Sequence, residues 1–431
     1  MARNKLEAEK KPNSAQRTSG DSDMENDVYD NLIEKVLSRN NLNDAYRRVK
    51  RNKGVPGIDG MTVDELGPYL REHRQEIKEA IRAGKYKEAP VKRVEIPKPD
   101  GSKRQLGIPT VRDRFVQQAV AQVLTPIYEQ VFSDNSFGFR PKRSAADAIE
   151  RARGCFESGL EVVVDIDMRK FFDEVNHDKL MYFIEQRIKD KLVLRLIRRF
   201  LVSGIMDNGM FQPCEKGTPQ GGPLSPLLAN IYLHVLDSYW ENHKELGVIV
   251  RYADDAVIVC RTRKDAELAF EHLKRIMTKL KLTLNPQKTK IVDMNKESFD
   301  FLGFRYQKFG KTKCGRKLPY MMPSKKAMKK VKDAIRVITC RKSAYEGLEQ
   351  KVGKLNPLIR GWRNYFQHGN STKRFKQLDE YVWMRLWRRV YYRRKQKKYR
   401  EHVLYGFRKW YATSGIEYFY YLNKKRYVAV F

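Results

Sequence analysis

The sequence predicts a mixed α+β domain followed by a basic, all-helical domain. Strand-like and helix-like apolar patterns alternate irregularly up to about residue 310, and helical periodicity with dense positive charge follows. A chain of 431 residues is too long for one ordinary core, so two or three domains are expected. We expect a polar tail over 1–25, the mixed domain over 26–310, the helical domain over 323–400 and a short basic region over 401–431.

Apolar spacing and turn chemistry define the elements of the mixed domain. Val94 and Ile96 alternate with polar residues and lead into the turn signal Pro97–Gly101, which indicates a β-hairpin. Ser225-Pro226 opens a helix, because proline suits the first helical position. In chain order we expect helices within 28–49 and 57–83, a hairpin over 91–109, a helix over 111–131, a buried strand over 162–167, a helix from 225, and an antiparallel strand pair over 248–250 and 256–259.

Positive charge is concentrated toward the C-terminal end of the chain. The net charge is +35, and residues 311–431 hold 33 Lys and Arg against 7 Asp and Glu, which is +26 of that total. Aromatic side chains interleave with this charge between Tyr381 and Arg389, where rings suit stacking on bases and cations suit phosphates. A merely solvated tail needs no such aromatics, so the pattern favours a nucleic-acid partner.

Two further features concern the compartment. No run of about 18 apolar residues occurs, so neither a membrane-spanning helix nor a membrane partner is expected. The five cysteines are scattered without a C-x-x-C pair, which predicts neither a zinc ribbon nor a disulfide framework. This composition fits a reducing compartment such as the bacterial cytoplasm.

Two acidic positions suggest the chemistry. Asp254-Asp255 lies between two strand-like runs, and alone it is consistent with an ordinary turn. Asp165 and Asp167 alternate onto one face, and alone they are consistent with an exposed strand end. The two positions would repel each other without a cation, and hard divalent ions prefer all-oxygen sites. Two ions roughly 4 Å apart activate a 3′-hydroxyl and stabilise pyrophosphate, so these residue types suit nucleotidyl transfer.

Eight motifs then follow one another in a specific order. They are 93–101 (RVEIPKPDG), 137–141 (FGFRP), 164–177, 217–226 (GTPQGGPLSP), 252–255 (YADD), 284–290, 301–304 (FLGF) and 358–366 (LIRGWRNYF). This series resembles the reverse transcriptases encoded by bacterial group II introns, which combine polymerase and maturase roles. The resemblance covers roughly residues 28–400. One such motif arises easily by chance, whereas eight in the family's order do not.

The resemblance implies a right-hand polymerase, with fingers and palm of antiparallel sheet and helices over 26–310 and a helical thumb, or maturase domain, over 323–400. It implies three catalytic metal ligands, Asp167, Asp254 and Asp255. Asp167 rather than Asp165 is the first palm aspartate, because Asp167–Phe172 fits the family pattern of Asp, a hydrophobic residue, two variable positions and two aromatics. The implied cofactor is a pair of Mg²⁺ ions, with Mn²⁺ as a substitute.

Six further residues are candidates for binding the incoming nucleotide. An aromatic ring packed under the sugar leaves no room for a 2′-hydroxyl. The resemblance gives this role to Phe171 or Phe172. The alternative is that these two phenylalanines are core residues. Within the paired-glycine loop 219–222, Gln220 offers a donor and an acceptor to the nascent base pair. Lys98 and Arg104 in the hairpin could reach the triphosphate, because mobile cations suit phosphate, although ordinary surface charge is the alternative for each. The resemblance makes Lys288 a candidate proton donor to pyrophosphate, with screening of the phosphate charge as the alternative.

The basic helical region provides candidates for nucleic-acid contacts. We expect phosphate contacts from the arginines of 358–366 and the charged residues beyond, namely Arg360, Arg363, Arg385, Arg388 and Arg389. The partners that the resemblance implies are an RNA template, a DNA or RNA primer, dNTPs, the group II intron RNA and target DNA. Residues after Tyr405 resemble the minimal DNA-binding tail of compact family members.

The chain departs from many relatives in one respect. No cysteine follows residue 340, and His368 and His402 stand alone, so no His- and Cys-rich H-N-H endonuclease is expected. Two alternative functions stay open beside the polymerase. The chain could be a domesticated relative serving phage defence, spacer acquisition or repair, or a non-catalytic RNA-binding splicing factor. The intact acidic residues and Gln220 argue against the second, because a pure binding module has no reason to keep a costly acidic cluster.

Overall fold

The computed structural model describes residues 31–97, 103–207, 209–309, 318–340, 346–393 and 400–420. These divide into two compact units, within Met1–Gln130 with Val175–Tyr232 (unit 1) and within Val131–Glu174 with Leu233–Phe431 (unit 2). The boundary predicted between the mixed domain, which ends at 310, and the helical domain, which begins at 323, falls inside unit 2. The tail predicted over 1–25 lies outside the described residues.

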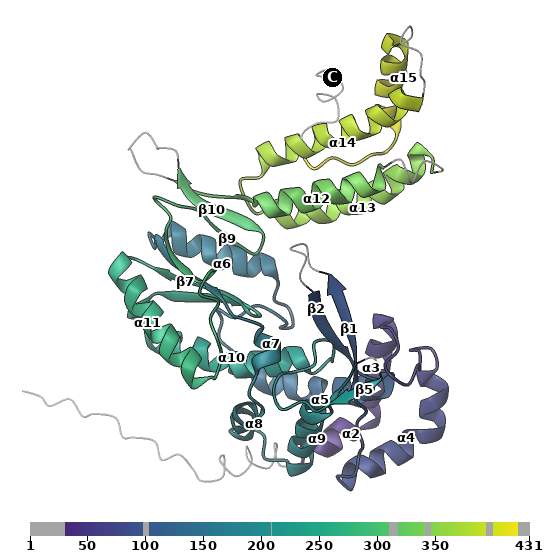
Figure 1. Ribbon diagram of the computed structural model, residues 1–431, viewed down its shortest axis with the longest axis vertical. Helices are drawn as coiled ribbons and strands as arrows, with labels where there is room; N and C mark the ends of the chain where they lie inside the picture. The colour runs from purple at the N-terminus through teal and green to yellow at the C-terminus, as the bar shows by residue number, and fades with distance from the viewer. Residues whose placement is uncertain are drawn as a thin grey trace, which may run out of the picture. The chain divides into compact units, whose positions relative to one another are not determined.

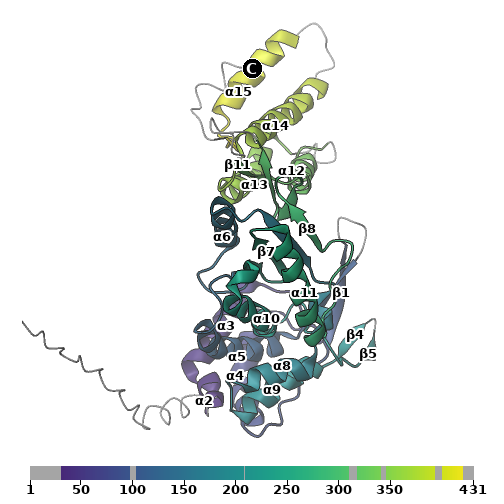
Figure 2. The same cartoon turned by 90° about the vertical axis from the view of Figure 1, so that its left-hand side faces the viewer.

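Unit 1 combines helices with a four-stranded sheet (Figure 1). β1 (Val91–Pro97) and β2 (Lys103–Ile108) form the antiparallel hairpin predicted over 91–109. β4 (Ile205–Asp207) pairs with β1 in parallel, and β5 (Met210–Gln212) extends the sheet beyond it (Figure 2). The helices are α2 (Leu32–Leu37), α3 (Arg39–Asn52), α4 (Leu66–Arg82), α5 (Val111–Glu129), α8 (His177–Glu185), α9 (Lys191–Val202) and the first half of α10 (Ser225–Asn242).

Unit 2 is built on a four-stranded antiparallel sheet that carries the acidic residues. Its strand order is β6 (Val248–Tyr252), β7 (Asp255–Cys260), β3 (Val162–Asp167) and β8 (Lys290–Asp293). α6 (Ala145–Glu157) and α11 (Arg263–Lys279) pack on this sheet (Figure 1). Val163, Val257 and Val259 share a core with α6, and Asp165 and Asp167 follow Val163 on the same face of β3.

Two short helices and a second sheet complete the mixed part of unit 2. α7 (Phe171–Glu174) follows β3 closely, and η1 (Lys244–Leu246) leads into β6. β9 (Phe299–Phe301), β10 (Phe304–Phe309) and β11 (Leu318–Pro323) form an antiparallel sheet. Among the described residues, strand structure is therefore present up to Pro323, at the far end of the predicted boundary segment.

The helical region predicted beyond the boundary is confirmed from Lys325 onward. It consists of α12 (Lys325–Ile338), α13 (Leu348–Phe366), α14 (Thr372–Arg393) and α15 (Arg400–Thr413). Phe366 on α13 packs against Phe304 of β10, with ring centroids 4.8 Å apart, and both belong to one buried cluster that also includes Leu378. The helices and the second sheet thus share a core. None of the described helices is long and apolar enough to cross a bilayer.

Candidate active site

The sheet of unit 2 brings the three predicted aspartates to one end. In the pairing of β3 with β7, Asp167 stands directly opposite Asp255. Tyr252 pairs with Asp255 across β6 and β7, so Ala253 and Asp254 form a two-residue turn between the strands. Ala253 has a φ of 59°, a left-handed conformation that a residue with a Cβ adopts at a cost of roughly 1–3 kcal/mol.

The carboxylates at this sheet end perturb one another. Desolvation by the surrounding protein, together with the charges of Asp254 and Asp167, raises the pKa of Asp255 to about 6. The side chain of Asp255 is nevertheless exposed to solvent. Burial likewise raises the pKa of Asp165 to about 6, with Lys290 opposing and Asp167 adding to the shift. Such perturbed acids are typical of functional sites, because ordinary folds avoid crowding like charges.

The segment after α11 surrounds Asp167. The backbone N–H of Asn285 donates to the Asp167 carbonyl at 2.9 Å, and the Thr289 hydroxyl lies 3.3 Å from both the backbone nitrogen and the carbonyl oxygen of Asp167. Lys288 extends over the carboxylate, with Nζ 3.3 Å from Oδ2. The structure therefore places Lys288 at the acidic sheet end, and its role with pyrophosphate stays a prediction.

The donor chemistry at this end suits a hard divalent cation, because its side-chain oxygens are carboxylates. Among the residues that the structure describes, however, no three His, Cys, Asp or Glu side chains are grouped closely enough to hold one ion together. The residue types thus fit a metal, while the side-chain positions do not form a closed cage.

Phe171 and Phe172 lie on α7, four and five residues after Asp167. Both are buried, at 2% and 8% exposure, and their rings meet edge to face with centroids 5.2 Å apart. Burial therefore does not separate the steric-gate candidate from a core phenylalanine, and both assignments stay open.

The structure describes only some of the candidate nucleotide-binding residues in unit 1. The Gln220 carbonyl accepts a hydrogen bond from the Gly107 N–H at 3.2 Å, which ties the loop to β2. Gly221 has a φ of 148°, and a Cβ there would lie 2.6 Å from the Gly107 carbonyl oxygen, which explains one of the paired glycines. Lys98 lies outside the described residues. Arg104 pairs with Ile96 through its backbone, and its side chain is not described.

Several of the predicted RNA-contacting arginines make contacts within the chain. Arg360 bonds Glu417, and Arg363 donates to the Tyr418 carbonyl at 3.0 Å with only 17% of its side chain exposed. The guanidinium of Arg385 reaches the Thr339 hydroxyl at 3.0 Å, whereas Arg388 is exposed. The side chain of Arg389 is not described. Arg388 is thus better placed than Arg363 for a phosphate contact.

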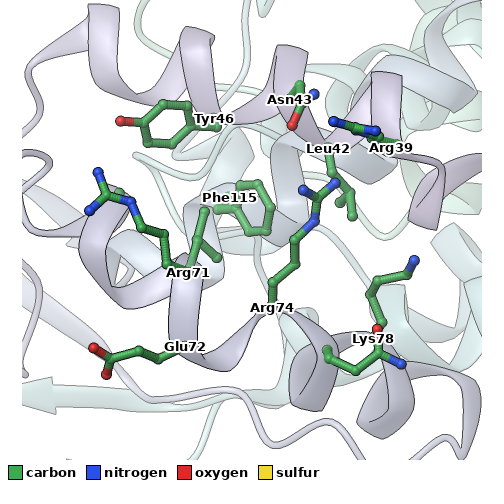
Figure 3. Close-up of a pocket in the computed structure, with 12 residues that line it drawn as sticks. Arg39, Leu42, Asn43, Tyr46, Arg71, Glu72, Arg74, Lys78 and Phe115 are labelled. Carbon is green, nitrogen blue, oxygen red and sulfur yellow. The ribbon is translucent and has the colours of Figure 1, made fainter.

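Unit 1 has a basic cavity of its own, between α3, α4 and α5. Its volume is about 690 Å³, and Figure 3 shows four cationic side chains around Leu42 and Phe115. These cations are Arg39, Arg71, Arg74 and Lys78. Such a surface suits a polyanion.

One buried residue at the sheet end escaped the sequence-based assignment. Arg251 on β6 is fully buried and bonds the carbonyl of Ala253 in the acidic turn. A cation directly after the apolar run Val248–Val250 was the available signal, because a charge inside a buried strand requires partners.

Comparisons with known families and proteins identify relatives of the chain. Residues 96–306 match the family described as reverse transcriptase (RNA-dependent DNA polymerase), and residues 328–406 match the group II intron maturase-specific domain. Protein YkfC of Escherichia coli is 34% identical over 303 residues, which are 61% of this chain and 79% of that protein. Group II intron-encoded protein LtrA of Lactococcus lactis is 38% identical over 214 residues, 49% of this chain but only 35% of LtrA. A structure of telomerase from Candida albicans aligns at 13% identity with a TM-score of 0.44, over 84% of this chain and 70% of that one.

The match over residues 96–306 places the chain in the class of nucleic-acid polymerases, and the acidic turn and the acidic strand end both lie within the matched residues. The second match narrows the class. The chain belongs to the reverse transcriptase family, in the branch that carries a group II intron maturase domain.

Proposed function

We propose that this protein copies an RNA template into DNA at the acidic end of the β6-β7-β3-β8 sheet, using a DNA or RNA primer and dNTPs. The observation that carries the proposal is the register of β3 and β7, which sets Asp167 opposite Asp255 beside the Ala253-Asp254 turn. Family membership supplies the reaction class, and the raised pKa of Asp255 supports a site where negative charge is concentrated.

Each candidate residue has a defined part in this proposal. Asp167, Asp254 and Asp255 would hold two Mg²⁺ ions, or Mn²⁺ in their place, which when bound supply Lewis-acid activation of the 3′-hydroxyl and charge neutralisation. Lys288, next to Asp167, is suited to screen or protonate the pyrophosphate. Phe171 or Phe172 excludes ribonucleotides, Gln220 contacts the nascent pair, and Lys98 with Arg104 approaches the triphosphate.

Primer extension on an RNA template tests the polymerase proposal. Wild type and Asp254→Ala are compared with dNTPs and Mg²⁺, and the variant is expected to lose cDNA synthesis by at least about 100-fold. Asp178→Ala serves as the matched control, because this carboxylate is 82% exposed and pairs only with Arg198 among the described residues. Equal cDNA yield from wild type and Asp254→Ala would rule out the assignment.

We propose a second role in binding group II intron RNA to assist its splicing and mobility, because residues 328–406 match the maturase-specific domain. The exposed Arg388 and the basic cavity of unit 1 support an RNA partner, and target DNA would be the substrate for mobility. A splicing assay with the intron RNA separates the roles: Asp254→Ala should splice normally while failing in primer extension. Reduced splicing by this variant would tie the two roles to one site.

The four described cysteines form no disulfide, which supports the proposal that the protein acts in a reducing compartment such as the cytoplasm.

A further inference from the structure

A buried cation lies directly behind the acidic turn. Arg251 is 0% exposed, on a strand whose preceding residues are apolar. Burying a guanidinium is costly unless all its donors are paired, so its partners indicate what the fold gains from it.

The Arg251 guanidinium joins three parts of unit 2. Nε donates to Asp237 Oδ1 on α10 at 2.8 Å, and Nη2 donates to Asp237 Oδ2. Nη2 also reaches the Ser136 hydroxyl at 2.7 Å, and Nη1 donates to the Ala253 carbonyl at 2.9 Å. Asp237 is also fully buried, so the pair is shielded from water.

The bond to Ala253 acts on the peptide that leads into Asp254. Ala253 has a left-handed backbone, and its carbonyl belongs to the Ala253–Asp254 peptide plane. A donor fixed at 2.9 Å holds that plane in one orientation, and the plane sets the direction in which Asp254 leaves the turn. Without this donor, a strained two-residue turn has other orientations available.

The segment Asn135–Gly138 supports the turn through its backbone. The N–H of Arg251 donates to the Asn135 carbonyl and the N–H of Phe137 donates to the Arg251 carbonyl, both at 2.9 Å. A Cβ on Gly138 would lie 2.2 Å from the Ala253 nitrogen. This contact gives a physical reason for glycine in the FGFRP motif.

We propose that Arg251 is a positioning residue for nucleotidyl transfer, which holds the Ala253-Asp254 turn in the orientation that its carboxylates need to bind the catalytic cations. The proposal rests on the polymerase function above. The competing interpretation is that Arg251 and Asp237 only stabilise the fold. An apolar pair can replace a buried ion pair with little loss of stability, but it offers no donor to the Ala253 carbonyl.

Two variants separate these interpretations. Arg251→Lys keeps a charge for Asp237 but lacks the planar, multi-donor geometry. Arg251→Met with Asp237→Leu removes the charge pair while keeping the site filled. The matched control is Lys308→Met with Glu161→Gln. This ion pair of unit 2 joins a buried lysine to a half-buried glutamate and makes no contact with the turn among the described residues.

Four quantities are measured for each variant: melting temperature in EDTA, Mn²⁺ affinity by calorimetry, RNA affinity, and kcat with KM for dNTP in primer extension. We expect folded Arg251 variants to lose Mn²⁺ affinity and to lower kcat by about 100-fold, with KM and RNA affinity nearly unchanged. The control variant should keep wild-type Mn²⁺ affinity and kcat.

The outcomes are distinguishable. Wild-type Mn²⁺ affinity and kcat in a folded Arg251 variant would overturn the positioning role. Failure of both variants to fold would assign the arginine to stability alone and overturn it equally. Absence of cDNA synthesis by the wild type would instead refute the polymerase proposal.

Discussion

The acidic sheet end should destabilise the protein when no cation is bound, and Asp255→Asn tests this directly. The substitution keeps the size of the side chain and removes its charge. In ion-free buffer at pH 8, we expect the variant to be more stable than wild type. The reason is that the surrounding protein and the charges of Asp254 and Asp167 disfavour the ionised form of Asp255.

The magnitude follows from the pKa of Asp255, which rises from 3.8 to about 6. At ~1.4 kcal/mol per pKa unit, the ionised side chain nominally costs ~3 kcal/mol at neutral pH. Because the side chain is exposed, solvent screening reduces this to about 1 kcal/mol. Well below the unfolded pKa of 3.8 the carboxyl is protonated in both folded and unfolded protein, and the cost is absent. The cost grows as the pH rises from 3.8 to about 6 and is complete above about 6, so little of it is present at pH 4.

Differential scanning calorimetry in EDTA at pH 4 and pH 8 measures the difference. Groups that do not interact with Asp255 titrate alike in wild type and variant and cancel, whereas removing the Asp255 charge also relieves part of the upward pKa shift of Asp165. Asp333→Asn is the control, since this carboxylate of α12 forms only a surface pair with Arg336 among the described contacts, and it should show no such pH dependence. A variant that melts no higher than wild type at pH 8 would refute the electrostatic reasoning. Added Mg²⁺ should stabilise wild type more than Asp255→Asn.

Three further outcomes are expected. Phe171→Val or Phe172→Val should raise ribonucleotide incorporation by at least about tenfold, which corresponds to ~1.4 kcal/mol, and the gate lies elsewhere if neither change does so in primer extension. RNA affinity should fall with salt with a log–log slope of about −4 or steeper, as six neutralised phosphates imply, and a flat slope in filter binding would exclude phosphate contacts. Tyr306→Phe should stabilise unit 2 by about 1 kcal/mol in thermal unfolding, because the buried Tyr306 hydroxyl has no hydrogen-bond partner among the described residues; a loss of stability would reveal a partner.

The sequence predicted those features of the site that depend on local patterns. The alternation Val163, Asp165, Asp167 predicted one acidic face, and the apolar runs around Asp254 predicted the hairpin. That β3 pairs with β7 in the register joining Asp167 to Asp255 depends on contacts nearly 90 residues apart, which periodicity does not encode. The ordered motif series supplied that information through family resemblance.

Contacts between side chains that are far apart in the chain could not be predicted from the sequence alone. Arg360 and Arg363 read as RNA ligands because nothing nearby marks Glu417, more than 50 residues later, as their partner. Arg251 was missed for the same reason, since Asp237 lies on a helix and Ser136 in a loop. Charged residues in apolar surroundings are informative in such cases, because each implies a partner whose identity only the fold reveals.

The buried pair also explains how the turn keeps its negative charge. Arg251 bonds the Ala253 carbonyl in the acidic turn, and an unpaired guanidinium there would attract the carboxylates and weaken cation binding. Asp237 accepts two of its hydrogen bonds and cancels its charge, so Arg251 provides orientation without net attraction. The cations that do act on the carboxylates, Lys288 near Asp167 and Lys326 near Asp255, belong to other segments of unit 2. Lys288→Ala should therefore raise Mg²⁺ affinity in calorimetry, because an exposed competitor for Asp167 is removed. Weaker Mg²⁺ binding by that variant would mean that Lys288 orders the site instead of competing for it.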